Sequence, residues 1–342
     1  MSLFLRVSLA LALVLALVSS SGAATAKKAG PGVPADKDYT GLIVIDAGDG
    51  KVLVEDNADV AAYPASVTKL MNLLLCLDAL EAGRVRLADR VVVTAEEAKM
   101  GGSQVYLKEG EVFTLEELLY AMMVQSANDA ALACANHVGG TREAFVAAMN
   151  QRAAQLGMTR TKFTTPHGLA SKGQDADVST PRDIAILSRE MVRHPLALKF
   201  TATKQRTFRQ EPLLVMNNHN KLLGQMPGCD GLKTGYLARG GYALAATVYQ
   251  NGKRVIAVVM GSKGVYGRQR DAIARRVIAE ALPKASPVPA ELAPQAPEPE
   301  AAVPVGTEPP EALSAEEGEE EQTDEPPMVE FRLPGAKPAG KK

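Results

Sequence analysis

The sequence has few cysteines and histidines, and it lacks the motifs of metal sites and phosphate-binding loops. Its 342 residues include only three cysteines, Cys76, Cys134 and Cys229, too few and odd in number for a disulfide-stabilised scaffold. Neither C-x-x-C nor H-E-x-x-H occurs, and no paired histidine cluster is present. A glycine-rich phosphate loop is also missing. We therefore expect neither a metal site nor a cofactor.

The chain also lacks an apolar run of comfortable membrane-spanning length. Val7–Val18 is apolar, but a spanning helix needs about 20 such residues. Arg6 is the only charge in this region, and Ala24-Thr25-Ala26 supplies small residues at a cleavage position. Residues 1–26 are therefore typical of a secretory signal peptide, with an uncleaved N-terminal anchor as the alternative. In both cases we expect export to the periplasmic or extracellular cell-wall space.

Apolar residues are scarce at the other end of the chain. From Pro283 onward lie 13 of the 21 prolines, and 13 acidic residues outnumber 5 basic ones. Such a segment buries too little apolar surface to offset the entropy that ordering would cost. We predict a disordered Pro/Glu-rich tail over residues 284–342, which leaves residues 27–283 as the folded domain. Ala336–Lys342 is basic without an apolar face, so we expect no clear membrane anchor in the mature chain.

The acidic tail leaves the rest of the chain with a modest net positive charge. This charge suits work beside anionic polymers, although charge alone identifies no partner. We expect no nucleic-acid partner.

Strand patterns occur at both ends of the folded part, and helical patterns lie between them. Hairpins are expected from Gly41–Asp46 with Lys51–Val54 and from Gly241–Tyr249 with Lys253–Gly261. Further short strands are expected at Arg90–Thr94, Arg206–Arg209 and Leu213–Met216. Helices are expected from Ser66 to near Gly83, and over 114–122, 129–138, 141–156, 182–193 and 268–282. The fold class is therefore α/β of the α+β type, an antiparallel sheet flanked by helices with an inserted all-helical subdomain.

One short stretch combines a hydroxyl and an amine at helical spacing. In Pro64-Ala-Ser-Val-Thr-Lys69, Ser66 and Lys69 are three residues apart, so their side chains can meet on one helical face. A serine hydroxyl needs a neighbouring base to become a nucleophile, and a lysine with a lowered pKa can serve. The alternative is a serine N-cap followed by an exposed lysine. Alone, the S-x-x-K spacing is a weak signal.

Two further stretches carry polar groups at the ends of predicted elements. Ser126-Ala127-Asn128 lies between two predicted helices, where its side chains would either cap the second helix or point into a cleft. Lys233-Thr234-Gly235 lies shortly before the strand that begins near Gly241. A lysine, a threonine and a glycine there would form a cationic edge that a ligand backbone can approach closely, or else an ordinary turn.

Taken together and in this order, the three stretches resemble the motif set S-x-x-K, S-x-N and K-T-G of penicillin-recognising serine enzymes. The strings Pro64–Lys69, Gln125–Asp129 and Asp230–Gly235 are similar to those of serine-type D-alanyl-D-alanine carboxypeptidases, which are low-molecular-weight penicillin-binding proteins. Thr165–Leu169 and Asn218–Leu223 resemble that family too. The resemblance covers roughly residues 38–282, and it implies a β-lactamase/transpeptidase-like fold.

The resemblance also implies roles for individual residues. Ser66 would attack the carbonyl between two D-alanines, and Lys69 would accept its proton. Ser126 would relay a proton to the leaving amine, and Asn128 would hold Lys69 and the substrate amide. Lys233 would supply positive charge and Thr234 would bind the terminal carboxylate. The backbone N–H groups of Ser66 and Tyr236, the residue after Gly235, would form the oxyanion hole.

Three positions depart from the family pattern. His219 lies between asparagines where some members have an arginine that helps to hold the substrate carboxylate, so its role there depends on its protonation state. Leu237 replaces a threonine that often follows the K-T-G-aromatic stretch. Cys229 lies near this stretch without an activating pattern around it.

The expected activity is that of an exported DD-carboxypeptidase. It would remove the terminal D-alanine from peptidoglycan stem peptides that end in D-Ala-D-Ala, and β-lactams would inhibit it covalently. A DD-endopeptidase with the same site is one alternative. A β-lactamase is another, but we find no convincing Glu-x-x-x-Asn between Asn128 and Lys233 for a deacylating water. The third is an inactive cell-wall-binding homologue, and no motif residue is lost.

Overall fold

A computed structural model describes residues 37–170 and 175–294. The predicted signal peptide, residues 1–26, lies outside the described residues, as does the predicted tail from residue 295 onward. Within the two described ranges, no helix is both long enough and apolar enough to cross a membrane.

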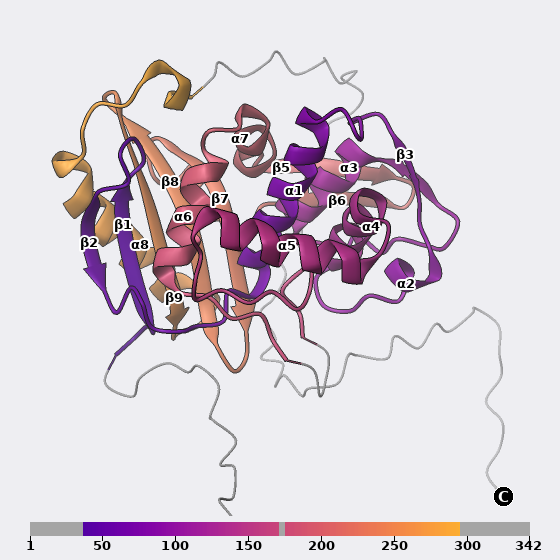
Figure 1. Ribbon diagram of the computed structural model, residues 1–342, viewed down its shortest axis with the longest axis horizontal. Helices are drawn as coiled ribbons and strands as arrows, with labels where there is room; N and C mark the ends of the chain where they lie inside the picture. The colour runs from indigo at the N-terminus through magenta and orange to yellow at the C-terminus, as the bar shows by residue number, and fades with distance from the viewer. Residues whose placement is uncertain (1–36, 171–174, 295–342) are drawn as a thin grey trace, which may run out of the picture. The chain divides into compact units, whose positions relative to one another are not determined.

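The central element is a five-stranded antiparallel sheet built from both ends of the folded chain (Figure 1). Its strand order is β2-β1-β9-β8-β7, so the two N-terminal strands continue the sheet that the three C-terminal strands form. The strands are β1 Gly41–Asp46, β2 Val52–Asp56, β7 Cys229–Leu237, β8 Gly241–Gln250 and β9 Lys253–Ser262. This arrangement places β7 at one edge of the sheet, and both predicted hairpins are confirmed.

Alternating side chains of the sheet supply two separate apolar cores. Ile43 and Ile45 of β1 face one core together with residues of α1, α4 and α6, whereas Leu42 and Val44 face a second core with α8. The alternation follows from the two-residue period of a strand. The helices concerned are α1 Lys69–Glu81, α4 Asn128–Gly139, α6 Pro181–Met191 and α8 Arg268–Ala281. The sheet is therefore covered by helices on both faces, as the sequence predicts.

The inserted part lies between β2 and β7 and includes α1, α4 and α6. It also holds further helices and two small two-stranded sheets, so it is not purely helical. Its further elements are η1 Ala65–Thr68, α2 Ala95–Ala98, α3 Leu115–Tyr120, η2 Ala121–Gln125, α5 Arg142–Leu156, α7 Pro195–Ala202, β3 Arg90–Val92, β4 Val112–Thr114, β5 Gln205–Gln210 and β6 Leu213–Asn217. Threonine side chains cap several helices, and the predicted capping box of Thr114 with Glu117 is confirmed. The sequence interpretation missed α2, α7 and β4.

The ordered chain continues past the predicted domain boundary at residue 283. The Arg254 guanidinium, which is fully buried, donates to the Leu292 carbonyl at 2.6 Å. The Ser286 N–H donates to the Asp46 carboxylate at 2.7 Å, and the Val288 N–H donates to the Gly252 carbonyl at 2.8 Å. Residues 284–294 are therefore tied to the sheet, because a few specific polar contacts outweigh a proline-rich composition. The predicted start of the disordered tail at residue 284 is wrong for this stretch.

Candidate active site

Ser66 lies in a 3-10 turn that immediately precedes α1, where two glycines allow neighbouring chain segments to come close. A Cβ atom on Gly235 of β7 would lie only 2.5 Å from the Pro64 carbonyl oxygen and 3.0 Å from the Ser66 backbone nitrogen. A Cβ on Gly168, whose φ is +93°, would lie 2.0 Å from the Ala65 carbonyl oxygen. Only glycine fits at these two positions. The edge strand β7 is thereby pressed against the backbone of the residue that carries the candidate nucleophile.

Lys69 is fully buried and turns its amine toward Ser66. Its Nζ lies 3.0 Å from Ser66 Oγ, 2.7 Å from Asn128 Oδ1 and 2.7 Å from the His167 carbonyl oxygen. Burial lowers the pKa of Lys69 well below its usual value, and the positive charge of Lys233 lowers it further. A free amine is therefore accessible nearer to neutral pH, which is what a base for the serine proton requires. The alternative of an exposed lysine is wrong.

Ser126 occupies the break between η2 and α4. Its backbone is left-handed, with φ of 63°, and its Oγ accepts a hydrogen bond of 2.9 Å from Lys233 Nζ. The first residue of α4 is Asn128, and no side chain caps this helix. The helix-cap alternative for Ser126-Ala127-Asn128 is therefore wrong, and both polar side chains belong to the same group as Lys69 and Lys233.

The Asn128 side chain is held in one orientation between Lys69 and the backbone of Gly101. Its Oδ1 receives the Lys69 amine, and its Nδ2 donates to the Gly101 carbonyl at 2.8 Å. The Asn128 backbone N–H donates to the Ser103 carbonyl at 2.7 Å. The amide of Asn128 is thus bound on both sides, which fixes its oxygen toward Lys69.

Lys233, Thr234, Gly235 and Tyr236 are consecutive residues of β7, which is an edge strand and not the turn that the alternative describes. Lys233 is buried, and its Nζ also donates to the Thr234 carbonyl at 3.1 Å. Burial, and then the positive charge of Arg270, lower the pKa of Lys233 to about 7. Thr234 is buried beside it, whereas Tyr236 is half exposed and its ring lies 4.4 Å from that of Tyr242.

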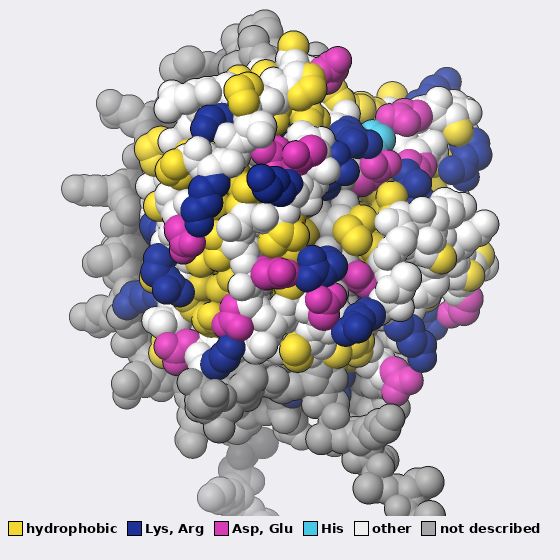
Figure 2. Space-filling model, turned by 60° about the vertical axis from the view of Figure 1, so that its left-hand side comes forward, with side chains coloured by type: hydrophobic (Ala, Val, Ile, Leu, Met, Phe, Trp, Pro, Cys, Tyr) yellow, Lys and Arg dark blue, Asp and Glu magenta, His cyan; other side chains and the backbone are white. Residues whose placement is uncertain are grey.

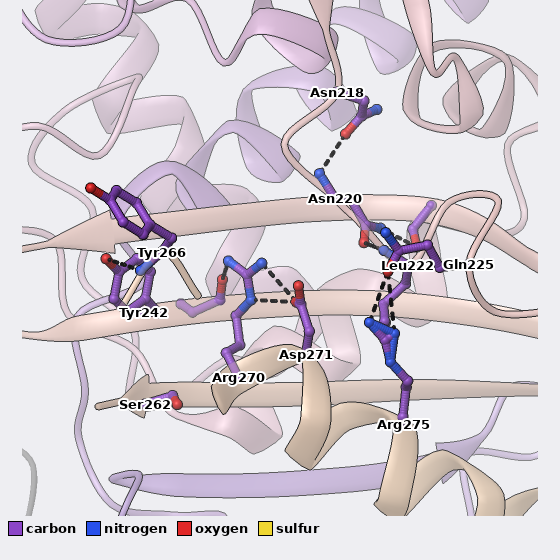
Figure 3. A network of polar contacts seen from close by, with 12 residues as sticks. Asn218, Asn220, Leu222, Gln225, Tyr242, Ser262, Tyr266, Arg270, Asp271 and Arg275 are labelled. Atoms are coloured by element: carbon purple, nitrogen blue, oxygen red, sulfur yellow. Dashed lines mark hydrogen bonds and ion pairs between the residues drawn. The ribbon is translucent and has the colours of Figure 1, made fainter. Parts of the chain in front are cut away.

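His219 lies on the segment between β6 and β7, near enough to Lys233 and Lys69 for their charges to act on it. Its neighbours Asn218 and Asn220 are buried and joined by a hydrogen bond of 2.9 Å, while Arg270 pairs with Asp271 nearby (Figure 3). Desolvation and the cations Lys233 and Lys221 lower the pKa of His219 to about 4. The side chain also reaches solvent, and the cations around it disfavour the imidazolium form. His219 is therefore neutral at pH 7 and supplies no positive charge for a carboxylate.

Two buried aspartates support the site and were missed from the sequence. Asp129 accepts hydrogen bonds from the N–H groups of Val105, Leu107 and Ala130. Asp177 accepts hydrogen bonds from Thr68, which precedes Lys69, and from Thr164 and Thr165. Asp129 ends the Gln125–Asp129 string but received no role from the sequence, and Asp177 lies in none of the strings.

A groove of about 460 Å³ lies elsewhere, between α6 and the β1–β2 hairpin. Its lining includes Arg182, which pairs with Glu55 and Asp59, and Arg189, which donates to the Ala47 carbonyl. Figure 2 shows basic and acidic side chains interspersed with apolar ones on the face that it presents. The arginines of this groove are thus bound within the protein, so the Ser66–Lys69–Lys233 group is the better candidate for chemistry.

Comparison with known proteins agrees with this geometry. The family model described as D-alanyl-D-alanine carboxypeptidase matches residues 28–264. The D-alanyl-D-alanine carboxypeptidase DacF of Bacillus subtilis is 37% identical over 222 residues, which are 64% of this chain and 56% of the relative. DacA of Escherichia coli is 33% identical over 274 residues, 78% of this chain and 67% of the relative.

Solved structures show the same fold. DacD of Francisella tularensis superposes with a TM-score of 0.67 at 28% identity, covering 72% of this chain and 71% of that one. Penicillin-binding protein D2 of Listeria monocytogenes, in its ampicillin-bound form, gives a TM-score of 0.64 at 29% identity, covering 71% and 97%. The chain spans little more than half the length of DacF, so the activity of the whole relative does not transfer with the family.

Proposed function

The chain belongs to the D-alanyl-D-alanine carboxypeptidase family of serine peptidases, and from this premise we propose that it removes the terminal D-alanine from peptidoglycan stem peptides. The reaction would proceed through an acyl-enzyme on Ser66. The observation that carries this proposal is the 3.0 Å contact between Ser66 Oγ and the buried, desolvated amine of Lys69.

In the proposed acylation, neutral Lys69 accepts the Ser66 proton while Oγ attacks the carbonyl carbon of the penultimate D-alanine. The backbone N–H groups of Ser66 and Tyr236 would bind the developing oxyanion, a contribution of about 3 kcal/mol per donor. The close approach of Gly235 to the Ser66 nitrogen supports this placement. The C–N bond then breaks, and the amine of the leaving D-alanine takes a proton through Ser126.

The two lysines have different tasks in this scheme. Lys233 binds Ser126 Oγ and would supply the positive charge that faces the carboxylate of the terminal D-alanine. Thr234 would donate its hydroxyl to the same carboxylate. His219 is neutral at pH 7, so its contribution would be limited to that of a neutral hydrogen-bond donor. Water would then hydrolyse the ester on Ser66, with Lys69 again as the base.

We also propose that β-lactams acylate Ser66. The Listeria relative is described in ampicillin-bound and cefotaxime-bound forms, and the arrangement around Ser66 suits the same attack on a strained amide. Export to the periplasmic or extracellular cell-wall space is part of the proposal, because the substrate lies there. It is supported by the composition of residues 1–26.

One experiment tests the proposed function. The protein and its Ser66→Ala variant are incubated with a fluorescent penicillin and with a diacyl-Lys-D-Ala-D-Ala peptide. We expect covalent label and D-alanine release from the wild type only. Label that persists in Ser66→Ala would contradict the proposed nucleophile. Rapid penicillin turnover without D-alanine release would identify a β-lactamase, and cleavage only of cross-linked dimers would identify an endopeptidase.

A further inference from the structure

Asp177 is a buried carboxylate that joins two segments of the site wall. It accepts five hydrogen bonds, all from threonines. Its Oδ1 receives the backbone N–H and the hydroxyl of Thr164, at 2.7 and 3.0 Å, and the backbone N–H of Thr165 at 2.9 Å. Its Oδ2 receives the Thr165 hydroxyl at 3.0 Å and the Thr68 hydroxyl at 2.8 Å. Thr68 directly precedes Lys69, so Asp177 ties the turn that carries the nucleophile to the segment of residues 164–168.

That segment forms the wall against which Lys69 rests. The His167 carbonyl lies 2.7 Å from Lys69 Nζ, and the Pro166 carbonyl accepts a hydrogen bond of 3.0 Å from Asn72 on the next turn of α1. Gly168 N–H donates to the Thr165 hydroxyl at 2.8 Å, which continues the network from Asp177. A shift of this segment would therefore move one of the three groups that orient the Lys69 amine.

Burial raises the pKa of Asp177, but its five hydrogen-bond donors oppose this shift and favour the carboxylate form. The negative charge of this carboxylate also acts on Lys69. Two cationic or titratable groups on other elements face the Lys69 amine, Lys233 on β7 and the imidazole of His167, and two carboxylates face it, Asp129 on α4 and Asp177. Burial lowers the pKa of His167 to about 3, so this ring is neutral. The positive charge of Lys233 favours the neutral amine, whereas the two carboxylates favour the ammonium form.

We propose that Asp177 is a positioning residue of the acylation step, which holds the His167 carbonyl against Lys69 and sets the lower pH limit of Ser66 acylation through its negative charge. The inference rests on the proposed function, because it requires Lys69 to be the base. Asp177 would then have two separable effects. Its charge would set the pH of the acidic limb of the acylation profile, and its hydrogen bond to Thr68 would affect the plateau rate.

Two substitutions separate these effects. In Asp177→Asn, the remaining Oδ1 can keep its three donors, and the new Nδ2 can donate to the hydroxyls of Thr68 and Thr165, because hydroxyls also accept. The charge is then lost with the tether largely kept. In Thr68→Val, the charge stays and the tether between η1 and the 164–168 segment is cut.

The measurement is the second-order rate of fluorescent-penicillin acylation between pH 5 and pH 10. Removing a negative charge near Lys69 makes the neutral amine available at lower pH. We therefore expect the acidic limb of Asp177→Asn to move down by about one pH unit. For Thr68→Val we expect an unmoved limb and a plateau rate reduced by about tenfold, because the nucleophile and its base lose their fixed geometry.

Asp183→Asn is the matched control. Asp183 is equally buried and accepts from the Arg160 N–H and the Thr161 hydroxyl, both at 2.8 Å, but it contacts none of the proposed catalytic residues. We expect Asp183→Asn to have a lower melting temperature than the wild type, but the same acidic limb and the same plateau rate of acylation. The inference is overturned if the acidic limb of Asp177→Asn lies at the same pH as that of Asp183→Asn. It is also overturned if the limb moves to higher pH. A wild type that is unlabelled at every pH overturns the proposed function instead.

Discussion

The proposed active site has a helical half, formed by Ser66, Lys69 and Asn128, and a strand half, formed by Lys233–Tyr236. Each half buries one lysine, but the two lysines are held by different means. Lys69 is bound by three oxygen atoms from three separate segments, and one of these segments is fixed by Asp177. Lys233 takes its position from β7, whose residues pair one by one with β8.

This difference indicates which half of the site is more sensitive to a single substitution. The register of a strand with a buried face is strongly specified by its pattern of buried side chains and by its turns, so replacing the Lys233 side chain leaves the pairing of β7 with β8 unchanged. The helical half depends on a few side-chain contacts from irregular segments, so one substitution there changes both geometry and charge. We expect the helical half to control the rate and pH range of acylation, and the strand half to control the binding of the substrate carboxylate.

The largest predicted effect separates the two lysines directly. Lys69→Met removes the proposed base, and we expect the acylation rate to fall at least about a thousandfold. Lys233→Met removes charge that would bind the substrate carboxylate, and we expect a loss of about a hundredfold, with a large share in KM. The measurement is peptide and penicillin kinetics on both variants. Equal losses with unchanged KM would show that the halves do not divide the work in this way.

A smaller effect is expected where the halves touch. In Gly235→Ala the new methyl group would meet the Pro64 carbonyl oxygen, so β7 and η1 must separate. We expect the acylation rate to fall about a hundredfold. We also expect the free energy of unfolding to decrease by about 1–3 kcal/mol.

Gly140→Ala provides the control for this prediction. Gly140 has φ of +78° and open space around its Cα, so alanine there costs stability through backbone strain alone. We expect that variant to unfold at lower denaturant concentration and to keep its acylation rate. An equal loss of rate in both variants would mean that stability, and not the contact between the halves, limits activity.

The same contrast explains what the sequence reveals. The S-x-x-K, S-x-N and K-T-G strings contain the residues of both halves, and the three-residue spacing allows Ser66 and Lys69 to meet on one helical face. The helices other than α2 and α7, and the two large hairpins, follow from periodicity and from capping residues such as Thr114. The Thr165–Leu169 string resembles the family, but its contact with Lys69 and the role of Asp177 could not be predicted, because contacts between irregular segments leave no periodic signal.

Composition misleads in a related way at the end of the domain. A proline-rich, acidic stretch is typical of disorder, yet residues 284–294 satisfy groups that the sheet leaves open. The Arg254 guanidinium binds the Leu292 carbonyl and also pairs with Asp230, at 2.8 Å, near the start of β7. Such a contact depends on the position of a buried guanidinium in the folded protein, and the composition of a sequence segment does not indicate that position.

The smallest predicted effect tests whether this C-terminal segment supports the strand half. Truncation after residue 294 keeps these contacts, and truncation after residue 283 removes the Leu292 carbonyl that accepts from Nε of the buried Arg254. An unpaired buried donor costs about 1–3 kcal/mol, so we expect the shorter chain to unfold at lower denaturant concentration. We expect both truncated chains to keep the acylation rate near the wild-type value at 25 °C, because β7 remains paired with β8. Equal stability of the two would show that residues 284–294 lie on the sheet without supporting it.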